Sequence, residues 1–421
     1  MSSALLALWI ALIGADRIDL AGGHGPFILT PFLALTPIVV VSEIIRRAMR
    51  RDVVTLSGRA IGYGAASAAL LCVCLASAIL SQQVPVSAAR TMLLVGDIAG
   101  TFAVAVLSAD RRDFRRVLAL GAMASLVLFV VCDVAEALYW IGRGPEMVRL
   151  GPVSLRFDQM QSLGPIPRLP GPVGDGNRAG FVLVAYAFFI AAGEPRVWLR
   201  RSAVALAIVL LVLPLSRSAT LAAVATVAIA LLSRRRGPSL RLAATAALMS
   251  TLVAAFFLAE PSVLGKLSGM VSSSVAQRLS TTEGSAQTHV ALIERGIDEG
   301  MESIPQAAIG LGYGSGYVVL QDIFPGNRYG NFHSLYVTMF AESGIFALLL
   351  TLLLMGIPLV LGGPWRPLIA GAVAFNLFYQ TTTEPVFWFV LAVAWLTIPA
   401  GAFSAGAARG TLHRPLPRSS R

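Results

Sequence analysis

The chain has 421 residues, of which 56% are hydrophobic and only 13% are charged. A soluble globular protein carries about 25% charged residues, so this composition argues against a soluble domain and indicates a membrane protein with many spans. The formal net charge is +11, but the arginines lie in short clusters between apolar runs. This placement argues against a nucleic-acid partner and in favour of a membrane-lipid environment.

Apolar runs follow one another along the whole chain, and each is a candidate transmembrane helix. A helix needs about 20 mainly apolar residues to cross a bilayer, and several runs are shorter than that. The runs lie near residues 3–22, 25–45, 58–80, 91–108, 117–138, 178–194, 202–215, 218–233, 242–259, 334–362, 367–380 and 385–404. The sequence therefore predicts an all-α, polytopic integral membrane protein with about 12 transmembrane helices.

The arginine clusters predict which side of the membrane each connection occupies. If the runs alternate across the bilayer, all the clusters fall on one side, and the positive-inside rule assigns that side to the cytoplasm. The clusters are "RRAMRR" (46–51), "RRDFRR" (111–116), "RVWLRR" (196–201), "SRRR" (233–236), Arg366 and the tail "RGTLHRPLPRSSR" (409–421). Both termini are then cytoplasmic.

Two long connections fall on the opposite, outer side, and loops of this length are usually functional or disordered. The first, residues 139–177, is rich in proline and glycine. The second, residues 260–332, contains the amphipathic stretch "THVALIERGIDEGM" and the turn-rich "GLGYGSGY", and we expect short helices there. The predicted organisation is therefore transmembrane helices 1–9 over residues 1–259, the large outer loop over 260–332, and helices 10–12 with the basic tail over 333–421.

Arg217 lies on the outer side, in "PLSRSATLAAV", at the tip of a tight helical hairpin. An arginine that only anchors a helix at the membrane interface is expected on the cytoplasmic side, and Arg217 is on the other. The guanidinium group matches two phosphate oxygens at once. We therefore interpret Arg217 as a ligand for an anionic lipid headgroup.

His333 opens one of the most apolar runs, "FHSLYVTMFAESGIFA" (332–347). Gly344 follows eleven residues later, which is close to three helical turns, so we expect it beneath His333 on one face of the helix. Glu342 is nine residues away and about half a turn out of phase, so it is not expected to orient the ring. A lone histidine at an interface also has a structural interpretation, which the spacing leaves open.

The stretch "GDGNRAG" (174–180) leads into the sixth run. Asp175 and Asn177 can hydrogen-bond sugar hydroxyls, and Arg178 is expected at the lipid interface. A loop followed by a helix start is the alternative interpretation. On the outer side there is no Asp-x-Asp motif, carboxylate cluster or His/Cys grouping, so the sequence predicts no metal site and no cofactor.

Residues 170–400 resemble the bacterial O-antigen ligase and O-antigen polymerase family, whose signature is H-[NSQ]-x9-G-x-x-G. His333, Ser334 and Gly344 match this signature, and Ala347 replaces its last small residue. The family also has an R-x3-L motif, which "RSATL" matches from Arg217. The chain also resembles the family in its twelve predicted spans, in the large outer loop before the histidine helix and in the stretch "PQAAIGLGYGSGY".

One position departs from the family. Its members usually have a second arginine in the large outer loop, shortly before the glycine-rich turn. Here the region reads "SAQTHVALIERG", and Arg295, Arg278 or His289 could take that place. The sequence does not choose among these three residues.

The resemblance implies a membrane glycosyltransferase of GT-C-like architecture in the bacterial inner membrane, with its site facing the periplasm. The donor would be an undecaprenyl-pyrophosphate-linked glycan. The acceptor would be lipid A–core in a ligase, or a second lipid-linked glycan in a polymerase. His333 and Arg217 would be catalytic, with Ser334 binding substrate. The reaction would be metal-independent and inverting, with arginines carrying the leaving-group charge.

Two other classes remain open. A secondary transporter or lipid-linked glycan flippase has a similar span count, and Asp97 and Asp133 lie inside apolar runs where acids serve proton relays. The motif "SADRRDFRR" (108–116) is similar to short turns of transporters, but it follows the fourth run, and the long loops here are outside. A non-catalytic partner in polysaccharide export is the other alternative. The loop at 139–177 slightly favours a polymerase over a ligase.

Overall fold

The computed structural model describes residues 2–21, 29–52, 56–81, 83–151, 153–157, 162–163, 166–235, 284–321, 323 and 330–399. The run expected at 242–259, Arg278 and the basic tail lie outside the described residues. Within them the fold is mostly helical, with a few short strands. This confirms the predicted helical class, while the number of spans stays a prediction.

The helices follow the apolar runs closely. They are α1 (Ser2–Leu12), α2 (Pro31–Arg50), α3 (Gly58–Leu80), α4 (Val84–Ser108), α5 (Phe114–Trp140), α6 (Gly176–Gly193), α7 (Val197–Val212), α8 (Arg217–Arg235), α12 (Gly284–Met301), α13 (Ile304–Ile309), α14 (Leu335–Leu361), α15 (Arg366–Asn376) and α16 (Pro385–Leu396). Polar residues begin several of them; for example, the Ser57 side chain accepts a hydrogen bond from the Ala60 amide at the start of α3.

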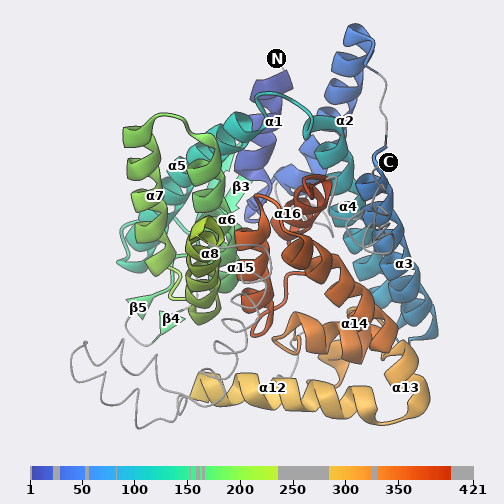
Figure 1. The fold of residues 1–421 in the computed structure, drawn as a ribbon. Helices are drawn as coiled ribbons and strands as arrows, with labels where there is room; N and C mark the ends of the chain where they lie inside the picture. The colour runs from blue at the N-terminus through green and yellow to red at the C-terminus, as the bar shows by residue number, and fades with distance from the viewer. Residues whose placement is uncertain are drawn as a thin grey trace, which may run out of the picture.

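Five of the described helices are long and apolar enough to cross a membrane: α3, α4, α5, α6 and α14. Shorter apolar helices lie at 3–12, 217–233 and 385–396. The helix α16 carries apolar residues on every face and is buried from Pro385 to Trp395, as expected for a helix at the centre of a bundle. Figure 1 shows it surrounded by other helices.

The connection between α5 and α6 contains short strands, which the sequence analysis did not predict, and one of its two small sheets also includes a strand that follows α1. The strands β1 (Ile18–Asp19), β3 (Val153–Arg156) and β2 (Met147–Leu150) form an antiparallel sheet in that order. A second pair joins β4 (Ser162–Leu163) to β5 (Ile166–Pro167). A short 3-10 turn, Gly171–Val173, follows and leads into α6.

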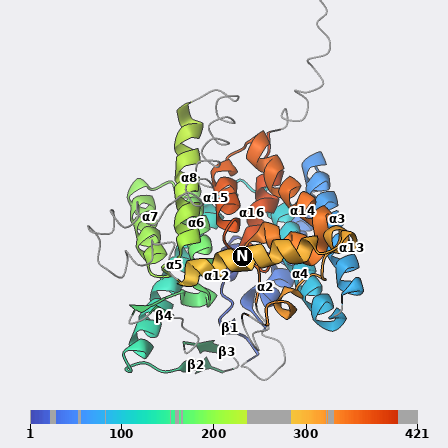
Figure 2. The same ribbon diagram turned by 90° about the horizontal axis from the view of Figure 1, so that it is seen from below.

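The helix α12 lies across the ends of the bundle helices, at the bottom of Figure 1 and in front in Figure 2. It confirms the helix expected in "THVALIERGIDEGM". Its Gly296 and Gly300 face α14 so closely that a Cβ atom there would lie 2.5 Å from side-chain atoms of Val337 and Phe340 respectively. We refer to this side of the molecule as the α12 end.

The helix α14 is broken at Gly344, whose φ is +78°. The break turns the carbonyls of Ala341 and Glu342 toward the neighbouring segment, where they accept hydrogen bonds of 2.9 Å from the amides of Leu311 and Gly312. A Cβ at Gly344 would collide with the backbone of α13. The predicted alignment of Gly344 beneath His333 on one continuous helix is therefore wrong, because the helix starts only at Leu335 and is interrupted before it reaches three turns.

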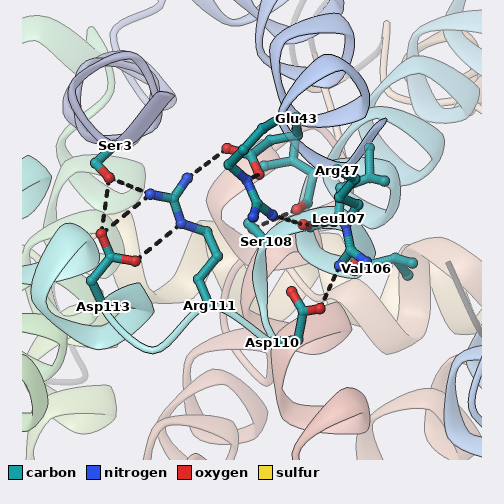
Figure 3. Close-up of polar contacts among 11 residues, drawn as sticks. Ser3, Glu43, Arg47, Val106, Leu107, Ser108, Asp110, Arg111 and Asp113 are labelled. Atoms are coloured by element: carbon teal, nitrogen blue, oxygen red, sulfur yellow. Dashed lines mark hydrogen bonds and ion pairs between the residues drawn. The ribbon is translucent and has the colours of Figure 1, made fainter. Parts of the chain in front are cut away.

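The opposite end of the bundle carries a network of charged residues (Figure 3), which we call the Arg111 network: Ser3, Glu43, Arg47, Asp110, Arg111 and Asp113. Arg111 contacts Ser3 and forms ion pairs with Glu43 at 2.6 Å and Asp113 at 3.1 Å. Arg47 pairs with Asp110 at 2.7 Å. The turn "SADRRDFRR" thus ties α1, α2, α4 and α5 together.

Candidate functional site

Several residues singled out in the sequence come together at the start of α6 and the tip of the α7–α8 hairpin. With their neighbours they form what we call the rim cluster: Arg168, Asp175, Asn177, Ser216, Arg217, His333 and Tyr379. Asp175 begins α6, where its carboxylate accepts 2.9 Å hydrogen bonds from the amides of Asn177 and Arg178. An acidic side chain is favoured at this helix position, so part of the role of Asp175 is structural.

The turn that carries Asp175 is held by a buried ion pair beneath it. Arg17 and Glu136 are paired, and the Glu136 carboxylate accepts a 3.2 Å hydrogen bond from the Gly171 amide. Gly171 has a φ of +59°, and a Cβ there would lie 2.5 Å from the Phe129 ring. Asp133, a candidate relay group for a transporter, lies beside this glycine. The loop is therefore fitted closely against α5.

Asn177 connects α6 to the hairpin that carries Arg217. Its side-chain oxygen accepts hydrogen bonds from the Ser216 hydroxyl at 2.9 Å and from the Arg168 guanidinium at 3.3 Å. Leu215, just before Ser216, has a φ of +52°, a conformation that non-glycine residues rarely adopt. The hairpin tip is thus fixed tightly, and Arg217 follows it as the first residue of α8.

Arg168 is a member of this cluster that the sequence analysis missed. Its Nε donates a 2.8 Å hydrogen bond to the Pro214 carbonyl at the hairpin tip. Burial and, to a smaller degree, the nearby charge of Arg217 lower the pKa of Arg168, while Asp175 acts in the opposite direction. Arg217 was singled out because it lies in a connection predicted to be on the outer side, and Arg168 lies in such a connection too.

His333 lies just before α14 with a φ of +52°. Its amide donates a 2.9 Å hydrogen bond to the Asn331 side chain, and its ring lies edge-on to Tyr379 with 5.9 Å between ring centroids. A left-handed conformation costs a residue of this kind roughly 1–2 kcal/mol, and such costs are often found at functional sites. The conformation therefore supports a functional role without assigning one.

Burial lowers the pKa of His333 to about 4, and the negative charge of Asp175 opposes this shift. Desolvation of the charged ring is the main cause of the shift. His333 is therefore neutral at neutral pH and can accept a proton.

Two predicted substrate-binding residues have protein partners instead. Ser334 is buried, and its hydroxyl donates a 3.3 Å hydrogen bond to the Asn376 carbonyl. Arg178 forms ion pairs with Asp16 and, at 2.9 Å, with Glu384, and only 19% of its side chain is exposed. The structure thus turns Arg178 into the protein and not toward the lipid interface, so that it joins α6 to the segments preceding β1 and α16.

Of the three candidates for a second loop arginine, the structure describes the side chain of Arg295. It lies on α12, where it pairs with Glu299 at 2.9 Å and is 43% exposed. The side chain of His289, like Arg278, lies outside the described residues. Arg168 is instead the arginine found beside Arg217.

Among the residues that the structure describes, no three His, Cys, Asp or Glu side chains are grouped as a metal ion would require. The rim cluster offers a different set of groups. It places two guanidinium groups, a neutral imidazole and a phenol at one end of a bundle of apolar helices. Such groups can bind an oxyanion and accept a proton.

Residues 202–352 match the family model described as O-antigen ligase. This match supports a relationship of the segment to the O-antigen ligase family. No curated protein matches the chain significantly. The O-antigen ligase segment contains Arg217 and His333, while Arg168, Asp175 and Tyr379 lie outside it. The residues that complete the rim cluster therefore come from parts of the chain that flank the family segment.

The match to the O-antigen ligase family supports an enzyme of the membrane glycosyltransferase type and a lipid-linked glycan as its substrate. The apolar helices, together with the family, are consistent with an inner-membrane protein.

Proposed function

We propose that the protein transfers a glycan from an undecaprenyl-pyrophosphate-linked donor to lipid A–core or to a second lipid-linked glycan, at the periplasmic face of the inner membrane. The main support is the rim cluster, in which Asp175 lies close enough for its charge to act both on Arg168, next to Arg217, and on the partly buried, neutral His333. In this proposal the chain has twelve spans in a GT-C-like arrangement, both termini are cytoplasmic, and the α12 end is periplasmic.

Arg217 and Arg168 would hold the donor pyrophosphate. The reaction breaks the bond between the anomeric carbon and the pyrophosphate oxygen, so negative charge grows on the leaving group. Fixed guanidinium groups stabilise that charge without a metal ion. The two hydrogen bonds from Arg168 to Pro214 and Asn177 preset its position, which reduces the cost of ordering it when the donor binds. Transfer is therefore expected to survive EDTA.

His333 would act as the general base. An acceptor sugar hydroxyl attacks the anomeric carbon from the side opposite the pyrophosphate, which inverts the configuration, and its proton passes to the imidazole. Because burial lowers the pKa of His333 to about 4, the ring is in its neutral, proton-accepting form when the acceptor arrives. General-base assistance is typically worth about 10²–10⁴-fold in rate.

The decisive experiment is reconstitution of the purified full-length protein in liposomes with a radiolabelled undecaprenyl-pyrophosphate oligosaccharide and an acceptor glycolipid. Transfer of label to the acceptor, lost in Arg217→Ala protein, supports the proposal. Translocation of the donor without transfer would support a flippase or transporter instead. If the protein binds the donor but neither transfers nor translocates it, the result would support a non-catalytic partner in polysaccharide export.

A further inference from the structure

A cavity opens at the α12 end, beside the Gly-rich turn. It has a volume of about 400 Å³ and lies between the α3–α4 connection, α12, α13 and the Gly-rich turn at 310–316. This size is within the range of small-molecule sites, about 300–1,000 Å³. No residue of the rim cluster lines it.

The polar groups of this cavity favour one class of ligand. They are the side chains of Ser81, Gln83, Glu299, Glu302, Ser303, Gln306 and Ser315. Carboxylates and hydroxyls accept hydrogen bonds from sugar hydroxyl groups, and amides both donate and accept them. The described lining contains two carboxylates, of which Glu299 is paired with Arg295, and no lysine or arginine, so it disfavours phosphate and suits neutral or amino sugars.

The remaining lining is apolar, and it borders a predicted membrane surface. Leu80 ends α3, one of the helices long enough to cross a membrane, and is 66% exposed. Ile309, Leu311 and Val318 continue the apolar side of the cavity. Ile304, next to the cavity at the start of α13, is 88% exposed. An opening that is polar on one side and apolar on the other, at the end of a span, suits a molecule that joins a sugar to a lipid.

One chain segment separates this cavity from His333. The Gly-rich turn presents Leu311 and Ser315 to the cavity. On its other face, the amides of Gly314 and Gly316 donate hydrogen bonds of 2.7 and 3.0 Å to the Glu342 carboxylate.

Gly316 also lies against the residue that precedes the catalytic histidine. A Cβ on Gly316 would be 2.7 Å from the ring of Phe332. A saccharide held in the cavity would therefore rest on the same segment that packs beside His333.

We propose that this cavity binds the neutral sugar residues of a glycolipid, and that this glycolipid is the acceptor. The assignment of this glycolipid as the acceptor rests on the proposed transferase function, whereas the binding of neutral sugars does not. The arginines of the rim cluster take the anionic donor, and the acidic cavity takes an uncharged saccharide. The opposite charge of the two sites would keep donor and acceptor from exchanging places.

Saccharide binding is tested with the full-length protein in nanodiscs and a photoreactive decyl glucoside as the probe. We expect crosslinks on residues 80–83 and 299–319, competed by decyl glucoside and not by dodecyl phosphate. Glu302→Arg and Gln306→Leu should reduce this labelling at least tenfold. Glu294→Arg is the matched control, since Glu294 is an exposed acid on α12, the helix that precedes Glu302, and does not line the cavity. Labelling that is unchanged in both variants, or equal competition by dodecyl phosphate, would overturn the proposal.

The acceptor role is tested by kinetics on the same variants. Glu302→Arg should raise the KM for the acceptor at least tenfold while leaving the KM for the donor and kcat at saturating acceptor unchanged. An unchanged acceptor KM in an active protein contradicts the acceptor role alone. If wild-type protein shows no transfer but the cavity is labelled as expected, the proposed transferase function fails and the saccharide site stands.

Discussion

Arginines gather at both ends of the helix bundle, but the partners of these arginines differ. In the Arg111 network, Arg111 lies between the carboxylates of Glu43 and Asp113, and the Arg111 hydrogen bond lowers the pKa of Asp113. In the rim cluster, Arg168 donates to the carbonyl of Pro214 and the amide oxygen of Asn177. These contacts of Arg111 are with carboxylates, and these two contacts of Arg168 are with neutral oxygens, while the charge of Asp175 also acts on Arg168.

The carboxylate partners of Arg111 indicate a structural role for it. A buried arginine with two carboxylate partners has its charge satisfied in the folded protein, and an added anion would meet those carboxylates first. Arg168 and Arg217 lie close enough that the charge of Arg217 helps to lower the pKa of Arg168. An anion bound between them would relieve that repulsion, as charge-assisted hydrogen bonds to phosphate do. The following changes test whether the two regions behave as this comparison requires.

The largest expected effect follows removal of Arg217. Arg217→Ala should lower the rate of glycan transfer by about 10²–10³-fold, the range for losing one preorganised charged contact. Arg217→Lys should recover only part of this loss because the planar fork is absent. Steady-state transfer by reconstituted protein, normalised to folded protein, measures both. A wild-type rate in well-folded Arg217→Ala protein would remove Arg217 from the reaction.

A smaller loss is expected for Arg168. Arg168→Ala should reduce transfer about 10- to 100-fold, because a hydrogen bond to a charged group contributes about 1.5–3 kcal/mol. Arg295→Ala is the matched control, since Arg295 pairs with Glu299 on α12, and it should stay within about twofold of wild type. If Arg295→Ala lost more transfer activity than Arg168→Ala, the second phosphate ligand would lie on α12.

Asp175→Asn should change the pH dependence more than the maximal rate. Asparagine can also accept hydrogen bonds at the start of a helix, so α6 should keep its cap. The charge of Asp175 raises the pKa of His333, and its removal should shift the acidic limb of kcat/KM to lower pH. An unshifted limb would mean that Asp175 does not act on the titrating group.

The smallest effect on transfer is expected at the opposite end of the bundle. Arg111→Ala leaves the buried Glu43 with Arg46 as its remaining ionic partner, so the loss of stability should be smaller than the about 3–5 kcal/mol that an unpaired buried charge costs. Thermal unfolding should therefore occur at a lower temperature, while the rate per folded molecule stays at the wild-type value. A large fall in kcat without loss of stability would show that this network takes part in turnover.

The sequence predicted the features of the fold that depend on local composition. Apolar runs located the helices, the amphipathic stretch predicted α12, and the placement of arginines drew attention to Arg217. The short strands of the first outer loop were missed because segments of two to four residues carry little periodicity. The break at Gly344 was also missed, because it depends on the carbonyls of Ala341 and Glu342 pairing with residues 311 and 312.

Features of the site that depend on distant contacts could not be predicted either. Arg178 pairs with Asp16 and Glu384, which are 162 and 206 residues away along the chain. Arg168 reaches Arg217 only because the hairpin tip folds back over α6. Sequence spacing within one helix says nothing about such contacts, so Arg178 was expected at the lipid interface and Arg168 was overlooked.

The most direct test of the central claim, that the rim cluster supplies a base for glycan transfer, is the pH dependence of kcat/KM. It compares wild-type protein with His333→Gln, and folding is checked at each pH. Because kcat/KM reports groups of the free enzyme and the pKa of His333 is lowered to about 4, the wild-type value should stay level from neutral pH and fall only as the pH approaches 4. His333→Gln should be at least about a hundredfold slower and lack this acidic limb. A near-normal rate with the same limb in His333→Gln would contradict the account.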